Sequence, residues 1–240
     1  MSGGGRTWTV IVPLTAAGQR RRAAWPSQAL ATAVVLDTVE AVAAAESVGR
    51  VVLAVDGEVH RRLGAVEAAG AEVSRVLVGD AVGADEIAAA ARRHVLGTWG
   101  AHRTAVIAGD LPFLCPPELD RTLGEAARFA VATLGDADGR RSVLQTFRDG
   151  DRMPEGADSD AGHAAQGWAE LDRLPNRSLR RDVDTLDHLA MVIDSDRGRE
   201  WGWPGSAPRT RAALRALGRA GVEPIAGWRA LAVPDGGVAV

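Results

Sequence analysis

The feature that most constrains the fold is a repeated alternation between short β-branched runs and segments with helical spacing. The runs cover residues 7–14, 50–56 and 72–78 and the stretch that begins at Thr104. The helical segments run from Ser27 to Gly49, from 58 to 69 and from about 85 to 96. Strands joined through helices by short connections form right-handed crossovers. The pattern therefore predicts an α/β protein with a Rossmann-like, mostly parallel central sheet flanked by helices.

The second half of the chain is less regular. Helices are expected at 117–128, 163–171, 186–193 and 208–220, and a strand at 129–134. The polar residues 148–162 fit either a substrate lid or a surface loop. A chain of 240 residues that is 46% hydrophobic can bury a substantial core. We expect one domain over residues 1–220 and a carboxyl-terminal extension over 221–240.

The run from Thr104 ends abruptly at Gly109 and Asp110, before Pro112. Ligands of open α/β sheets bind at the carboxyl ends of the strands, so Asp110 is expected at the mouth of a crevice. A carboxylate there can hold Mg²⁺, which binds one or two carboxylates together with substrate phosphates. The alternative is that Asp110 caps the helix that begins near Pro117.

Composition excludes several classes of function. The net charge of -3 and the pI near 6.0 give no reason to expect nucleic-acid binding. No apolar run approaches a membrane span, and the amino terminus lacks a signal pattern, so we expect a cytoplasmic protein. Cys115 is the single cysteine, which excludes an internal disulfide, and its apolar surroundings indicate a packed loop. Lysine is absent, so any long cationic side chain that binds phosphate is an arginine.

Two loops in the first half could receive a nucleotide. Arg20, Arg21 and Arg22 follow the first strand and could face a triphosphate, although a solvated charge run explains them as well. Gly83 lies in a turn that leads into a helix, where backbone N–H groups can bind an anion. The nearby Asp80, Asp85 and Glu86 would repel that anion, so spacing alone makes this a weak signal.

Two later segments carry further candidates. The turn at 135–139 is followed by Arg140, Arg141 and Ser142, which could bind a phosphorylated acceptor, or the segment is an ordinary turn. Asp182 and Asp184 alternate in an expected extended segment, where residues two apart face the same side. They could converge on one metal ion, or Asp184 could cap the next helix while Asp182 pairs with an arginine.

Four motifs together resemble the 2-phospho-L-lactate and phosphoenolpyruvate guanylyltransferases of coenzyme F420 biosynthesis. The motifs are residues 108–112 (AGDLP), 136–139 (DADG), 179–185 (LRRDVDT) and 208–211 (PRTR). The resemblance extends from about Thr7 to Leu217 and implies a nucleotidyltransferase version of the Rossmann-like fold. It implies that Asp110 and Asp182 bind Mg²⁺ and are catalytic. Asp184 is a further candidate metal ligand, and Gly83 and Gly109 are candidate nucleotide contacts.

By the same resemblance, an acceptor phosphate attacks the α-phosphorus of GTP, or of another nucleoside triphosphate, and pyrophosphate leaves. The acceptor is a small phosphorylated carboxylic acid, held by Arg140, Arg141, Ser142, Gly162 and His163. No nucleic acid or membrane partner is implied, and a homodimer is left open.

The substrate motifs depart from the family pattern. Residues 13–16 (PLTA) replace a motif that contains lysine, and Gly83 opens GADEI where the family has Gly-Leu-Asn. Residues 139–142 (GRRS) replace a Gly-Thr-Gly-Thr motif, and His163 takes the place of a serine. Two alternatives follow: a catalytically degenerate relative that serves as a nucleotide-binding or protein-interaction module, and a nucleotidyltransferase with a different phosphorylated acceptor.

Overall fold

The computed structural model describes residues 7–15, 25, 27–64, 66, 68–79, 83–100, 103–137, 141–148, 167–171, 176–183, 185, 189 and 207–220. The predicted arginine loop (Arg20 to Arg22), Arg140, Gly162, His163, Asp184, the helix at 186–193 and the extension 221–240 lie wholly or almost wholly outside these residues.

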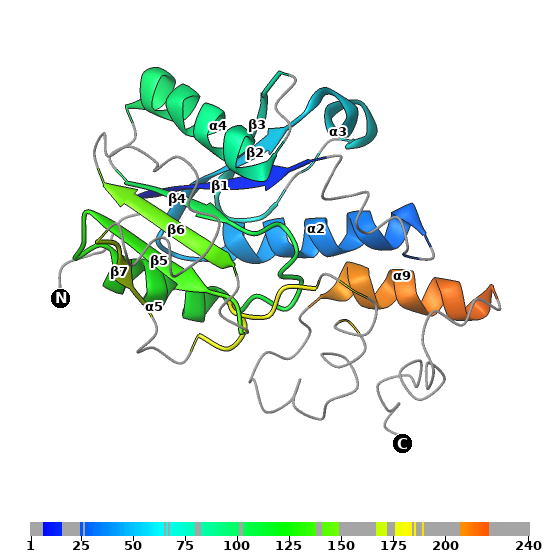
Figure 1. Cartoon of the computed structure of the whole chain (residues 1–240). Coiled ribbons are helices and arrows are strands. Elements are labelled where there is room, and N and C mark those ends of the chain that lie inside the picture. Colours follow the sequence, from blue (N-terminus) through cyan, green and yellow to red (C-terminus); the bar gives the residue numbers. More distant parts are fainter. Residues whose placement is uncertain are drawn as a thin grey trace.

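A sheet of seven strands in the order β3-β2-β1-β4-β6-β5-β7 forms the centre of the molecule (Figure 1). The strands are β1 (Trp8–Leu14), β2 (Val48–Val55), β3 (Glu72–Leu77), β4 (Arg103–Ile107), β5 (Val131–Gly135), β6 (Ser142–Arg148) and β7 (Ala169–Glu170). All neighbouring strands pair in parallel except at β6, which is antiparallel to β4 and β5. The predicted mostly parallel α/β sheet is confirmed.

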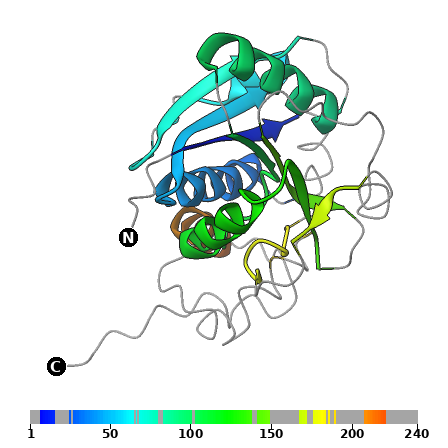
Figure 2. The same cartoon turned by 90° about the vertical axis from the view of Figure 1, so that its left-hand side faces the viewer.

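Helices cover both faces of the sheet. The view in Figure 2 shows α4 (Ala84–Trp99) on one face and α2 (Gln28–Ala44) with α5 (Pro116–Ala126) on the other. α9 (Pro208–Arg219) packs against α2, and the short α3 (Gly57–Arg62) follows β2 (Figure 1). None of the helices in the described part of the chain has the length and apolar character needed to cross a bilayer.

Each face of the sheet contributes to its own apolar core. Ile11 of β1 and Val52 of β2 belong to the same cluster as Ile87, Ala91 and Val95 of α4. The opposite face joins the inward residues of α2 and α5 in a second cluster: Val35, Val39, Val42, Leu119 and Leu123. The core strands read as nearly continuous apolar runs because they are covered on both faces.

Several predicted boundaries were wrong. α2 ends at Ala44, and Gly49 lies inside β2 rather than at the end of the helix. α3 stops at Arg62, because Leu63 takes an extended conformation and its side chain is buried; the expected helix over 58–69 is not formed.

Two strands of the second half were not predicted. Val143, Leu144 and Phe147 of β6 are buried, and the strand inserts between β4 and β5. In place of the helix expected over 163–171, residues 169–170 form β7 beside β5, and the Leu171 N–H donates to the Thr133 carbonyl at 2.9 Å. β6 pairs with β5, the strand just before it, and with the more distant β4, whereas β7 takes its partner from β5 far earlier in the sequence.

Candidate functional site

The candidate site lies where the strand order reverses. From β1 the chain builds outward through β2 to β3, and then returns to add β4 on the other side of β1. The carboxyl ends of β1 and β4 therefore flank a topological switch point, which is the common ligand crevice of open α/β sheets. Asp110 follows β4 by three residues and so lies at this crevice, as predicted.

Gly109 allows the loop after β4 to approach β1 closely. A Cβ atom at Gly109 would lie 2.8 Å from Leu14 Cδ2 and 3.3 Å from Val12 Cγ1. These distances are shorter than ordinary packing contacts, so the position requires glycine or a shift of the core side chains. The structure thus gives Gly109 a packing function beside the site; its predicted contact with the nucleotide stays a prediction.

Asp110 is fixed through its own backbone and that of its neighbour. The Leu111 N–H donates to Thr38 Oγ1 at 3.0 Å, and the Thr38 hydroxyl donates to the Val34 carbonyl at 2.9 Å within α2. The Asp110 carbonyl accepts the Val183 N–H at 2.9 Å. The predicted alternative role of Asp110 as a helix cap was wrong, because α5 begins after Cys115 and has no side-chain cap hydrogen bond.

The hydrogen bond between Val183 and Asp110 brings the second predicted aspartate to the site. Asp182 directly precedes Val183, so residues 110 and 182 are neighbours although 72 positions separate them. Residues 177–180 form a turn and 181–183 are not assigned to a β-strand, and Asp184 lies outside the described residues, so the expected convergence of Asp182 and Asp184 stays a prediction. Backbone pairing with the loop after β4 is what places Asp182 near Asp110.

The predicted acceptor segment reaches the same region. The Ala137 N–H donates to the Arg180 carbonyl at 2.8 Å, and the Asp136 N–H donates to the Arg141 carbonyl at 2.8 Å. Ser142 begins β6, and its hydroxyl lies 2.9 Å from Thr133 Oγ1. The structure therefore brings Arg141 and Ser142 to the edge of the sheet that carries Asp110.

Gly83 belongs to a different part of that edge. It precedes α4, which follows β3, and β3 is separated from β1 by β2. A Cβ atom at Gly83 would meet nothing within 4 Å, and the first turn of α4 carries Asp85 and Glu86. The backbone at the start of α4 is therefore not covered by neighbouring atoms at Gly83, and the carboxylates of Asp85 and Glu86 follow in the first turn.

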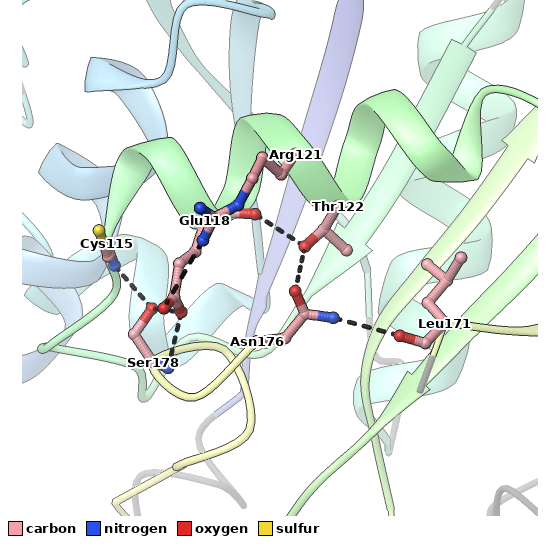
Figure 3. A network of polar contacts seen from close by, with 7 residues as sticks. All are labelled: Cys115, Glu118, Arg121, Thr122, Leu171, Asn176 and Ser178. Atoms are coloured by element: carbon pink, nitrogen blue, oxygen red, sulfur yellow. Dashed lines mark hydrogen bonds and ion pairs between the residues drawn. The ribbon is translucent and has the colours of Figure 1, made fainter. Parts of the chain in front are cut away.

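Sequence reasoning missed a polar network that holds the segment before Asp182 (Figure 3). Ser178 accepts the Cys115 N–H at 2.9 Å and donates its hydroxyl to Glu118 at 2.6 Å. Asn176 accepts the Thr122 hydroxyl at 2.9 Å and donates to the Leu171 carbonyl at 3.2 Å. Such residues are common in loops and helices, so only the buried environment marks them.

Cys115 is a structural residue in this network. Burial raises the pKa of its thiol above the ordinary value, which lowers the thiolate fraction at neutral pH. The prediction of a packed loop rather than an activated nucleophile is confirmed.

The carboxyl-terminal PRTR motif docks on α2 through Asp37. The buried Asp37 carboxylate accepts the Arg209 N–H at 3.1 Å and the Thr210 N–H at 2.7 Å, and so caps the start of α9. Leu214 of α9 belongs to the same buried apolar cluster as Phe113, three residues after Asp110, and Val183, whose N–H binds the Asp110 carbonyl. The motif therefore packs α9 against the segments that carry Asp110 and Asp182.

The chemistry of the donors suits Mg²⁺. Asp110 and Asp182 offer hard oxygen ligands, and Mg²⁺ commonly uses one or two carboxylates and takes its other ligands from water and phosphate. Within the part of the chain that the structure describes, no group of three or more His, Cys, Asp or Glu side chains could hold a metal ion. Two protein carboxylates meet the usual requirement of the ion.

The chain thus combines a Rossmann-like sheet with two aspartate-bearing segments that meet at its switch point. No family model matches it. The chain is 34% identical to the phosphoenolpyruvate guanylyltransferase of Thermomonospora curvata, over 86% of this chain and 88% of the relative. It is 37% identical to that of Salinispora arenicola over 77% and 87%, and 32% identical to that of Frankia casuarinae over 88% and 78%.

The chain therefore belongs to the phosphoenolpyruvate guanylyltransferase family and is a guanylyltransferase-like nucleotidyltransferase, as the motifs predicted. Solved structures support the fold. A 4-diphosphocytidyl-2C-methyl-D-erythritol synthase superposes with a TM-score of 0.50 at 13% identity, over 78% of this chain and 97% of the other. The Rv0371c homologue of Mycobacterium sp. strain JC1 gives 0.51 at 17% identity, over 78% and 94%.

Proposed function

We propose that the protein transfers a guanylyl group from GTP to phosphoenolpyruvate or 2-phospho-L-lactate and thereby contributes to coenzyme F420 biosynthesis in the cytoplasm. The observation that carries this proposal is the hydrogen bond between Val183 and Asp110, which makes neighbours of two aspartate-bearing segments at the switch point. The names of the relatives support a guanylyl group and phosphoenolpyruvate as its acceptor, and 2-phospho-L-lactate comes from the motif resemblance.

In the proposed reaction, an oxygen of the acceptor phosphate attacks the α-phosphorus of GTP. A new P–O–P bond forms, the bond between the α-phosphorus and the bridging oxygen breaks, and pyrophosphate leaves with that oxygen. No general base is needed, because the acceptor phosphate is already ionised at neutral pH. Positioning and charge neutralisation therefore supply most of the catalysis.

We assign three binding roles to three groups of residues. Asp110 and Asp182, together with Asp184, would hold Mg²⁺, which supplies charge neutralisation on the phosphates when bound. Arg20, Arg21 and Arg22 would bind the triphosphate, and the Arg140–Ser142 segment, with Gly162 and His163, would bind the acceptor. Guanidinium groups suit both tasks because they donate two parallel hydrogen bonds to a phosphate.

The test is pyrophosphate release by the purified protein with Mg²⁺, each of the four common nucleoside triphosphates and either acceptor. We expect release with GTP, and we expect Asp110→Asn to lower the rate by at least about 100-fold, since removal of one charge-stabilising group typically costs that much. Glu125→Gln, at an exposed residue of α5 that pairs with Arg128, is the matched control and should retain the wild-type rate.

Three outcomes would overturn parts of the proposal. Absence of release with every combination, without stabilisation by any nucleotide, would support the degenerate module. Pyrophosphate release only with a different phosphorylated acceptor would change the proposed substrate but leave the proposed reaction type in place. Equal rates for Asp110→Asn and wild type would exclude Asp110 from the site.

A further inference from the structure

The turn at residues 176–180 is tied to α5 by a network of buried polar groups, which we call the α5 network and define as Glu118, Thr122, Asn176 and Ser178 (Figure 3). Glu118 Oε2 accepts both the N–H of Ser178, at 2.9 Å, and its hydroxyl, at 2.6 Å. The Thr122 hydroxyl donates to Asn176 at 2.9 Å. The two contacts lie one helical turn apart, so they fix the direction of the segment as well as its distance from α5.

Three members of the network are deeply buried, and the fourth is partly buried. Thr122, Asn176 and Ser178 are 0%, 2% and 4% exposed, and the Glu118 side chain is 15% exposed. Buried polar groups of this kind are costly when they lack partners, whereas a satisfied network favours one arrangement of its segment. The position of residues 176–180 on α5 is therefore well defined.

The same segment reaches both halves of the proposed site within a few residues. The Arg180 carbonyl receives the Ala137 N–H from the acceptor turn, and the Val183 N–H binds the Asp110 carbonyl. Asp182 lies between these two contacts and is four residues from Ser178. A shift of the turn on α5 would move Asp182 relative to Asp110 and to the acceptor turn at the same time.

We propose that Glu118, Ser178 and Asn176 are positioning residues for the reaction: they set the placement of Asp182 beside Asp110 and beside the acceptor turn. This inference rests on the proposed function. It predicts that loss of the network weakens binding of the divalent ion and of the acceptor, while binding of the nucleoside triphosphate through the loop after β1 changes little.

The chain offers a matched control on the same helix. Asp120 of α5 accepts the N–H of Glu46 at 3.0 Å, the N–H of Ser47 at 2.8 Å and the Ser47 hydroxyl at 2.6 Å. Like Glu118, it binds a backbone N–H and a serine hydroxyl of a distant segment. Its partners lie between α2 and β2, at the opposite end of β2 from the crevice.

The experiment compares Glu118→Ala and Ser178→Ala with Asp120→Ala in the full-length chain. Binding of Mn²⁺ is measured by electron paramagnetic resonance without substrates, and melting temperatures report folding. Steady-state rates then give kcat and the KM values for GTP and for phosphoenolpyruvate. Glu118→Gln and Ser178→Thr, which keep an acceptor oxygen and a hydroxyl, serve where an alanine variant does not fold.

We expect all three alanine variants to melt below wild type. Only Glu118→Ala and Ser178→Ala should weaken Mn²⁺ binding and raise the KM for phosphoenolpyruvate, each by about tenfold, with the KM for GTP within about twofold of wild type. Loss of a residue that orients a metal ligand typically costs roughly 10–100-fold in metal affinity. Glu118→Gln and Ser178→Thr should recover most of the affinity for Mn²⁺.

Two results would overturn the inference. Mn²⁺ affinities of the Glu118 and Ser178 variants within twofold of wild type would show that the network acts only on stability. An equal loss in Asp120→Ala would show that any destabilisation of α5 has the same effect. If the wild-type protein itself neither binds Mn²⁺ nor releases pyrophosphate, the proposed function fails and this inference fails with it, which is a distinguishable outcome.

Discussion

The two sides of the switch point are held together in different ways. On the side of β4, hydrogen bonds join segments that are distant in the sequence, as between Asp110 and Val183 or between Thr38 and Leu111. On the side of β2 and β3, the Asp56 cap of α3 is local and the ion pair between Arg50 and Glu72 is exposed, whereas the contact between Asp120 and Ser47 just before β2 is long-range.

The difference indicates which side of the switch point tolerates substitutions. The loop after β4 and residues 176–183 share partners, so a substitution in one segment alters the position of the other. Gly83, on the β3 side, opens onto free space and belongs to a segment that departs from the family pattern. We infer that the side of β4, which carries Asp110 and Asp182 and is called the carboxylate side below, has a fixed geometry. The β3 side can accept substitutions with a smaller loss of stability.

The largest expected effect on stability is at Asp37, which links α9 to the carboxylate side. Asp37→Ala would leave the N–H groups of Arg209 and Thr210 without their acceptor, and we expect a loss of about 3 kcal/mol in the free energy of unfolding. Urea denaturation measures it. Glu40→Ala, which removes only the exposed partner of Arg209, should cost less than about 1 kcal/mol. Equal losses would contradict the assignment of Asp37 as the docking residue.

A paired glycine substitution sharpens the comparison between the two sides. Gly109→Ala forces Leu14 and Val12 to move within the core and should cost about 1–2 kcal/mol. Gly83→Ala meets no neighbour and should cost about 0.5 kcal/mol, through a slightly poorer start of α4. Thermal unfolding of both variants measures the two losses in stability. A larger loss of stability in Gly83→Ala would reverse the proposed ranking of the two sides.

The smallest expected effect is at the exposed ion pair of the β2–β3 edge. The hydrogen bond from Arg50 holds the pKa of Glu72 below its ordinary value, despite a smaller opposing contribution from burial. Because the folded pKa is lowered, the pair contributes stability above the ordinary pKa of Glu72 and loses it as the pH falls through the lowered value. Proton-carbon NMR titration should show the pKa of Glu72 rising in Arg50→Met. An unchanged pKa would exclude the pair with Arg50 as the cause of the lowered pKa of Glu72.

The sequence predicted the elements whose signals are local. The β-branched runs of β1, β2 and β3 and the amphipathic spacing of α9 were sufficient, because each pattern repeats within one element. β6 and β7 were missed because β7 has only two residues and the apolar run of β6 is interrupted by Gln145 and Thr146. The end of α3 at Arg62 was missed because burial of Leu63 overrides the helical propensity of the residues that follow.

The candidate site shows the same division. The abrupt end of the run at Asp110 indicated a crevice, and the family motifs indicated Asp182, but the backbone hydrogen bond that brings the two segments together had no local signal in the sequence. The α5 network could not be predicted, because it joins Thr122 to Asn176 across 54 positions and Glu118 to Ser178 across 60. Contacts of that range are defined only by the folded chain.

The central claim is that Asp110 and Asp182 act at one site. A double-substitution cycle tests it most directly, with the rate of pyrophosphate release measured for Asp110→Asn, Asp182→Asn and the double variant. Residues that act as a unit are strongly non-additive, so the double variant should be no slower than the slower single variant, within about threefold. Losses that multiply in the double variant would show that the two aspartates act independently and would contradict the account.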